Sequence, residues 1–121
     1  MPLDITTLGI GTLAQATTLS LSSHLLYKPS ATAPKKTAIV HGMRFTNVGS
    51  AAAKVQLFFV KNGGTAGTDE RRILPKDFTV PVGYTIIDDD QVTLDSGDGL
   101  YAFADTASTM DFAVSGSERP A

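Results

Sequence analysis

The chain has 121 residues, enough for one domain that buries roughly two-thirds of the surface its unfolded form would expose. A hydrophobic fraction of 42% and a charged fraction of 18% favour a packed globule over a disordered segment. The formal net charge of −2, without a long basic run, disfavours nucleic-acid binding, and zero cysteines exclude disulfides, thiolate nucleophiles and cysteine-based zinc sites.

The first residues, MPLDITTLGIGTLAQ, lack the basic n-region and long apolar core of a signal peptide. No window of the sequence reaches the roughly 18 apolar residues that a membrane-spanning helix requires. We therefore expect a protein that is made and kept soluble, with no membrane partner.

Residues 1–16 are predicted to form an extended N-terminal arm. Residues 3–16 are rich in Leu, Thr and Ala and too apolar for a solvated tail. Such arms commonly add a strand to a neighbour's sheet edge or lie on a partner's surface.

Residues 17–121 show period-2 segments rich in Thr, Val, Ile, Leu and Phe that alternate with Gly- and Pro-containing turns. This pattern predicts an all-β domain, a single antiparallel β-sandwich of about eight strands with jelly-roll or immunoglobulin-like topology. The expected strands are 17–28 (one long or two short), 37–48, 53–61, 71–74, 83–88, 92–94, 100–104 and 110–116.

Alternation along the longer strands predicts the core, because successive side chains of a strand point to opposite faces. The residues expected to meet between the two sheets are Leu19, Leu21, Leu25, Tyr27, Ile39, Met43, Phe45, Val55, Leu57, Phe59, Met110, Phe112 and Val114.

A glycine pattern near the N-terminus, Gly9-x-Gly11-x-x-Ala14, matches the dinucleotide-binding fingerprint. That fingerprint works only where a strand turns into a helix, and the Thr-rich sequence that follows favours extended chain. We therefore interpret the segment as an arm or edge strand and expect no cofactor.

Carboxylates gather at Asp88-Asp89-Asp90, with Asp95 and Asp98 close behind. Hard oxygen ligands of this kind suit Ca²⁺, but the spacing matches no EF-hand loop, and adjacent side chains on a strand alternate faces. A solvated turn is the favoured interpretation, and no metal site is predicted.

Catalytic motifs are lacking. His24 and His41 fall on different predicted strands without a partner motif, and neither G-x-S-x-G nor H-E-x-x-H occurs. We expect a protein that is not an enzyme.

The strand 53–61 raises the question of a partner. If Val55, Leu57 and Phe59 face the core, then Phe58 and Val60 form an apolar outer face that must be covered. Cover by another chain is predicted, and cover by a loop of the same chain is the alternative. The predicted protein interface comprises Leu3, Ile5, Leu8, Ile10, Leu13, Phe58 and Val60.

The succession of turns and strands over residues 20–116 resembles the small β-sandwich virion proteins of tailed bacteriophages. The similarity departs at residues 33–35 and at the acidic run 88–90. The matching elements are Tyr27 with Pro29, Thr46 with Asn47, the valine-rich segment 55–60, the turn 81–83, and the segments 94–98 and 114–116.

The resemblance implies a non-enzymatic structural protein of the virion, made in the host cytoplasm. It implies a capsid decoration or cement protein that binds the major capsid protein or another virion protein, stabilises the outer capsid and forms a homo-oligomer, a dimer or trimer. A tail, neck or fibre component and a carbohydrate-binding module for host recognition remain as alternatives.

Overall fold

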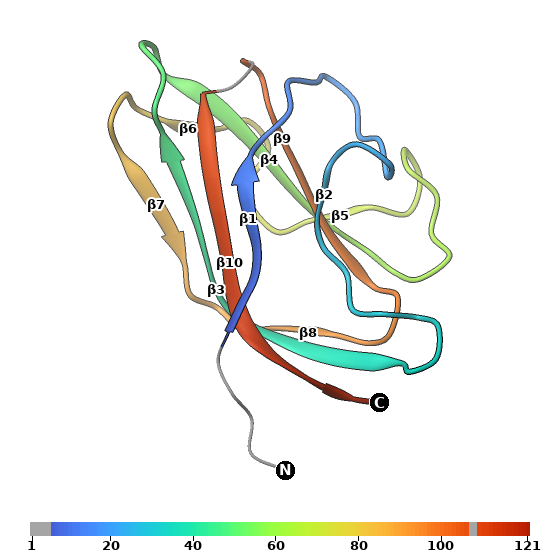
Figure 1. The fold of residues 1–121 in the computed structure, drawn as a ribbon. Coiled ribbons are helices and arrows are strands. Elements are labelled where there is room, and N and C mark those ends of the chain that lie inside the picture. The colour runs from blue at the N-terminus through green and yellow to red at the C-terminus, as the bar shows by residue number, and fades with distance from the viewer. Residues whose placement is uncertain (1–5, 107–108) are drawn as a thin grey trace.

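A computed structural model describes residues 6–106 and 109–121. Within these ranges the chain forms two antiparallel five-stranded sheets and contains no helix (Figure 1). The predicted fold class, an all-β antiparallel sandwich, is confirmed.

The first sheet, here called sheet I, has the order β1-β10-β3-β7, and β8 also pairs with β3. Its strands are β1 (Thr6–Thr12), β10 (Met110–Pro120), β3 (Lys36–Asn47), β7 (Thr85–Asp88) and β8 (Val92–Leu94). The second sheet, sheet II, has the order β2-β9-β4-β5, and β6 also pairs with β4. Its strands are β2 (Leu25–Tyr27), β9 (Gly99–Ala104), β4 (Ala53–Val60), β5 (Arg71–Arg72) and β6 (Phe78–Val80).

The ten segments occupy eight strand positions. β7 and β8 pair with successive stretches of β3, and β5 and β6 pair with successive stretches of β4, so each pair acts as one interrupted strand. Strands β1 to β4 alternate between the two sheets. β10 lies between β1 and β3 in sheet I, and β9 lies between β2 and β4 in sheet II. This arrangement is the double Greek key of a jelly roll. An immunoglobulin-like sandwich places its first two strands in one sheet, whereas β1 and β2 lie in opposite sheets here.

Three strand predictions were wrong. Residues 17–24 form no strand, because the backbone turns there: the His24 N–H donates to the Ser20 carbonyl at 3.1 Å. β6 is a strand of 3 residues that was not predicted, and β10 extends to Pro120 rather than ending at 116.

The N-terminal segment belongs to the sandwich rather than standing apart as an arm over residues 1–16. β1 pairs antiparallel with β10, the Leu13 side chain is 3% exposed, and Gln15 forms a β-bridge with Ala104. From residue 6 onward the predicted boundary at residue 17 is therefore wrong, because β1 completes sheet I of its own chain and Gln15 joins β9 of sheet II.

A β-bulge in β3 changes which residues face the core. The pairing with β10 moves from Gly42–Ser115 to Val40–Gly116, so His41 has no paired residue on β10. The alternation of buried and exposed side chains along β3 therefore shifts by one residue. Val40 is consequently fully buried and Ile39 is not, contrary to the prediction.

Most of the predicted core is confirmed, apart from Ile39 and the leucines up to and including the first residue of β2. Leu25 is 45% exposed, and Leu19 and Leu21 are only partly buried, because they precede or begin the short β2. The predicted residues that are buried or packed against the core are Tyr27, Met43, Phe45, Val55, Leu57, Phe59, Met110, Phe112 and Val114.

Candidate interaction surfaces

The outer face of sheet II is covered by the chain itself. Phe58 and Val60 are only 4% and 2% exposed. The Phe58 ring stacks on Phe103 with centroids 5.8 Å apart, and the Arg72 guanidinium lies 4.8 Å from the Phe58 centroid. An aromatic layer therefore fills this face.

Two loops complete the cover. The His24 ring, at the end of the turn before β2, lies 5.1 Å from the Phe103 centroid. The loop after β4 closes over Val60, where a Cβ built on Gly64 would lie 2.8 Å from the Val60 Cγ1. The prediction that another chain covers Phe58 and Val60 is wrong, because loops of the same chain bury both side chains.

His24 is held as a neutral acceptor. The Ser20 N–H donates to His24 Nδ1 at 2.9 Å, so the ring proton resides on Nε2. Burial lowers the pKa of His24 below its ordinary value, because the charged imidazolium is poorly solvated there. His24 thus acts as part of the cover, and His41 lies in β3 of the other sheet.

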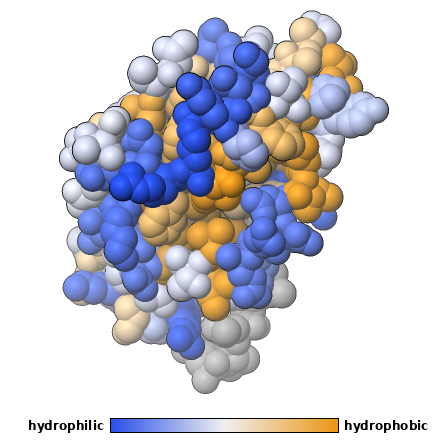
Figure 2. All heavy atoms as spheres, turned by 180° about the vertical axis from the view of Figure 1, so that it is seen from behind, coloured by the Kyte–Doolittle hydropathy of each residue, from blue (hydrophilic) through white to orange (hydrophobic). Residues whose placement is uncertain are grey.

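Seen from the side opposite to Figure 1, hydrophobic side chains lie in the middle of the molecule and hydrophilic side chains border them (Figure 2). This side is therefore of mixed polarity rather than uniformly apolar.

The predicted interface residues of the N-terminal segment divide into three groups. Leu3 and Ile5 lie outside the described residues. Leu8 packs partly buried against the core, and Leu13 is inside it. Among the described members of this set, Ile10 is the exposed one, at 76%.

Among the described residues the outer face of sheet I has no such cover, and two rows of side chains cross it. Register pairs β1 with β10, β10 with β3 and β3 with β7, so each row takes one residue from each strand. The apolar row with one cation is Ile10, Ala113, Arg44 and Ile87, and the polar row is Thr12, Asp111, Thr46 and Thr85. These eight residues are called the open face below.

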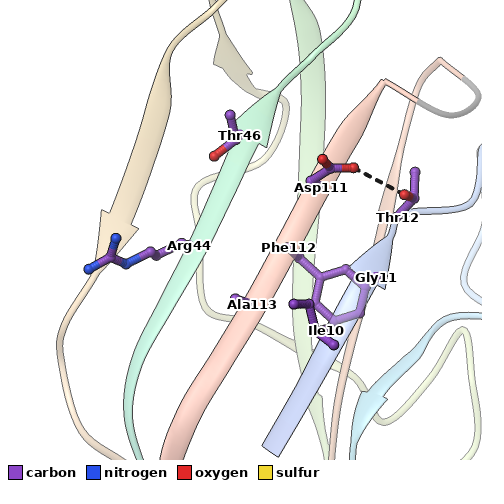
Figure 3. A pocket seen from close by; sticks show the side chains of 8 residues that line it. All are labelled: Ile10, Gly11, Thr12, Arg44, Thr46, Asp111, Phe112 and Ala113. Atoms are coloured by element: carbon purple, nitrogen blue, oxygen red, sulfur yellow. Dashed lines mark hydrogen bonds between the residues drawn. The ribbon is translucent and has the colours of Figure 1, made fainter. Parts of the chain in front are cut away.

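The open face contains a shallow trough of about 410 Å³ (Figure 3). Arg44 extends over β7, while Asp111 turns toward β1 and accepts a hydrogen bond from the Thr12 hydroxyl at 3.0 Å. Thr46 and Thr85 share a hydrogen bond of 2.8 Å. The cation and the carboxylate therefore point apart and do not neutralise each other directly.

Ion pairs of the described chain lie elsewhere. Lys36 pairs with Glu118 at 3.2 Å, and Lys61 pairs with Asp95 at 3.4 Å and Asp98 at 3.5 Å. Arg44 and Asp111 belong to none of these pairs, which leaves both charges accessible to a partner.

The Lys36 pair includes a third member that ties the sandwich together. The Tyr27 hydroxyl donates to Glu118, which joins β2 of sheet II to β10 of sheet I. Burial raises the pKa of Tyr27, and the Tyr27 hydrogen bond, with help from Lys36, holds the pKa of Glu118 below its usual range. This cluster stabilises the fold, because its polar groups already form hydrogen bonds and an ion pair with one another.

Carboxylates of the acidic segment accept hydrogen bonds from backbone N–H groups of the same chain. The Asp90 N–H donates to Asp88 Oδ1 at 3.1 Å, and buried Asp98 accepts from the N–H groups of Asn62 and Asp95 at 2.9 and 3.1 Å. Among the described residues no three His, Asp or Glu side chains are grouped to hold a metal ion. The Gly9-x-Gly11 pattern lies in strand β1 and precedes no helix.

No helix in the described ranges is long and apolar enough to cross a membrane.

Comparison with known proteins identifies no family for this chain. No protein-family model matches the sequence, and no curated protein matches it. A solved structure with a similar arrangement is a chain from the crystal structure of the T13 IBDV viral particle, with 10% sequence identity and a TM-score of 0.46. The match covers 96% of this chain but only 30% of that one. At this level the likeness carries no argument.

Sequence reasoning missed the open face, although one signal was present. Arg44 and Ile87 occupy positions that alternate with core residues, and their register across β3 and β7 joins them on one surface. Pairing between strands far apart in the sequence cannot be read from single-strand periodicity.

Proposed function

We propose that this chain is a non-enzymatic structural protein of a tailed-phage virion, of the capsid decoration or cement type. The observation that carries the proposal is the open face of sheet I, which no described segment of the chain covers, whereas loops bury the outer face of sheet II. An uncovered sheet face with apolar residues and unpaired charges is typical of a contact surface.

Two further observations support this role. The sequence over residues 20–116 resembles small phage virion sandwiches. Jelly rolls occur in viral capsids, although also in lectins and cupins, so the fold alone does not choose among them.

The physical demands of a cement protein suit such a chain. It needs a rigid body and a complementary patch rather than a catalytic site, and many copies arranged about the symmetry axes of a shell strengthen one another. The partner proposed here is the major capsid protein or another virion protein, and the location is the capsid surface.

The two other roles predict different surfaces. A sugar-binding module uses exposed aromatic side chains as stacking platforms, and Tyr84, at 64% exposure, is the one large aromatic among the well-exposed hydrophobic side chains of the described residues. A tail, neck or fibre component would share the fold and differ only in its position in the virion.

The test starts from the phage that encodes the chain. Mass spectrometry of purified virions should detect the chain, and electron microscopy with labelled protein should place it on the head. Capsids lacking the chain should bind it back. Arg44→Glu should weaken this binding at least 10-fold, whereas the matched charge reversal Arg71→Glu, on β5 of sheet II, should not.

Absence of the chain from virions would overturn the proposal, and labelling confined to the tail would favour the tail role. Binding to host glycans in place of capsids would favour the carbohydrate-binding role.

A further inference from the structure

Four strand edges flank the two sheets, and three of them carry features that discourage pairing with another chain. β2 has 3 residues, and β5 consists of two arginines. β7 has 4 residues and leads into the acidic run 88–90. Short length and charge are the usual means by which proteins protect sheet edges.

β1 lacks both protections. It has 7 residues, Thr6–Thr12, with no charged residue and no proline, and most of its side chains are exposed. Its one irregularity is a register shift between Thr7 and Gly9, which leaves the stretch from Gly9 to Thr12 regular. An exposed, uncharged, regular edge is a ready template for another strand.

The pairing with β10 shows which backbone groups face outward. The Leu13 N–H donates to the Met110 carbonyl at 2.8 Å, so the residues that bond inward are Leu13 and, by alternation, Gly11. Ile10 and Thr12 therefore direct their N–H and C=O groups to the open edge.

We propose that the occupant of this edge is β1 of a second copy, paired antiparallel about a two-fold axis at Gly11. In this register Ile10 faces Thr12 of the second copy and Thr12 faces its Ile10, so two such pairs exchange four backbone hydrogen bonds. The two sheets I join into one continuous sheet.

The side chains of β1 are compatible with pairing between the β1 strands of two copies. The two Ile10 side chains become diagonal neighbours across the axis, which partly covers a residue that is 76% exposed in the single chain. The facing glycines at position 11 bring no side chains into conflict, and an uncharged strand meets no like charge when it pairs with itself. With the axis at Gly11 the paired stretch is Ile10–Thr12 of each copy, and a two-fold contact closes at two copies because each β1 takes part in the same contact.

This inference does not depend on the proposed virion role, and light scattering behind a sizing column tests it on the purified chain. The expected mass is that of a dimer. Ile10→Lys should raise the dissociation constant about 100-fold, because the contact between the two isoleucines is lost and two like charges meet. Ile87→Lys is the matched control, since Ile87 is 62% exposed on the opposite edge of the same sheet, and it should leave the dimer intact.

The absence of cysteine allows a second, independent measurement. A short bismaleimide should cross-link Ile10→Cys into covalent dimers and leave Ile87→Cys monomeric on a denaturing gel. A monomer at about 100 μM, a trimer, or equal effects of the two lysine substitutions would overturn the proposal. Circular dichroism of each variant separates lost association from lost folding.

Discussion

Replacing Phe58 by alanine should destabilise the single folded chain, because the structure makes this side chain part of an internal layer. Phe58 is 4% exposed, stacks on Phe103 and lies under the Arg72 guanidinium. Buried Phe→Ala substitutions cost about 3–5 kcal/mol through lost burial and the cavity left behind. We expect a loss of about 4 kcal/mol, which for a domain of this size lowers Tm by roughly 12–20 °C.

Urea unfolding followed by circular dichroism measures this loss. Tyr84→Ala is the matched control, since Tyr84 is 64% exposed and its replacement should change stability by no more than about 0.5 kcal/mol. The loss at Phe58 should be the same at low and high protein concentration, because the cover comes from the same chain. A loss below about 1 kcal/mol, or one that grows with protein concentration, would refute the assignment and restore Phe58 as an interface residue.

Three further predictions concern the bulge, a buried amide and a histidine. Val40→Ala should cost about 2 kcal/mol and Ile39→Ala less than 1 kcal/mol in urea unfolding, because the bulge at His41 turns Val40 inward. A larger loss for Ile39→Ala than for Val40→Ala would contradict the register of β3 with β10. Asn47→Ala should cost about 2–4 kcal/mol in the same assay, because Asn47 is 1% exposed and its side-chain amide donates to the Ala51 and Val80 carbonyls at 2.9 Å each. A loss under 1 kcal/mol would mean that water replaces these hydrogen bonds. His24 has a folded-state pKa below its ordinary value, so the unfolded chain binds more protons and stability falls as pH drops through about 6.5. His24→Asn should reduce this loss of stability between pH 7 and 5, and identical pH profiles would exclude His24 as its source.

Local patterns in the sequence were sufficient for the fold class and for much of the core. Alternation in β4 placed Val55 and Leu57 inside, and turn residues separated most of the strands. These features follow from side-chain periodicity and backbone preferences, which act over a few residues.

The candidate surfaces were less accessible to sequence reasoning. The apolar outer residues Phe58 and Val60 suggested a partner chain, whereas loops near residues 24 and 64 cover them. Whether a loop folds back over a sheet depends on contacts between distant segments, and no local pattern encodes these contacts.

The sequence by itself determined that this protein is an all-β sandwich with a strongly alternating core, because period-2 burial is a property of each strand taken alone. Only the tertiary structure decided the jelly-roll order of strands, the bulge at His41 that exchanges Ile39 for Val40, and the incorporation of residues 6–12 into sheet I and of Gln15 beside β9 of sheet II. It also decided that one sheet face is covered and the other open. These features arise from pairing between segments far apart in the chain, where the register of one strand sets the faces of the next.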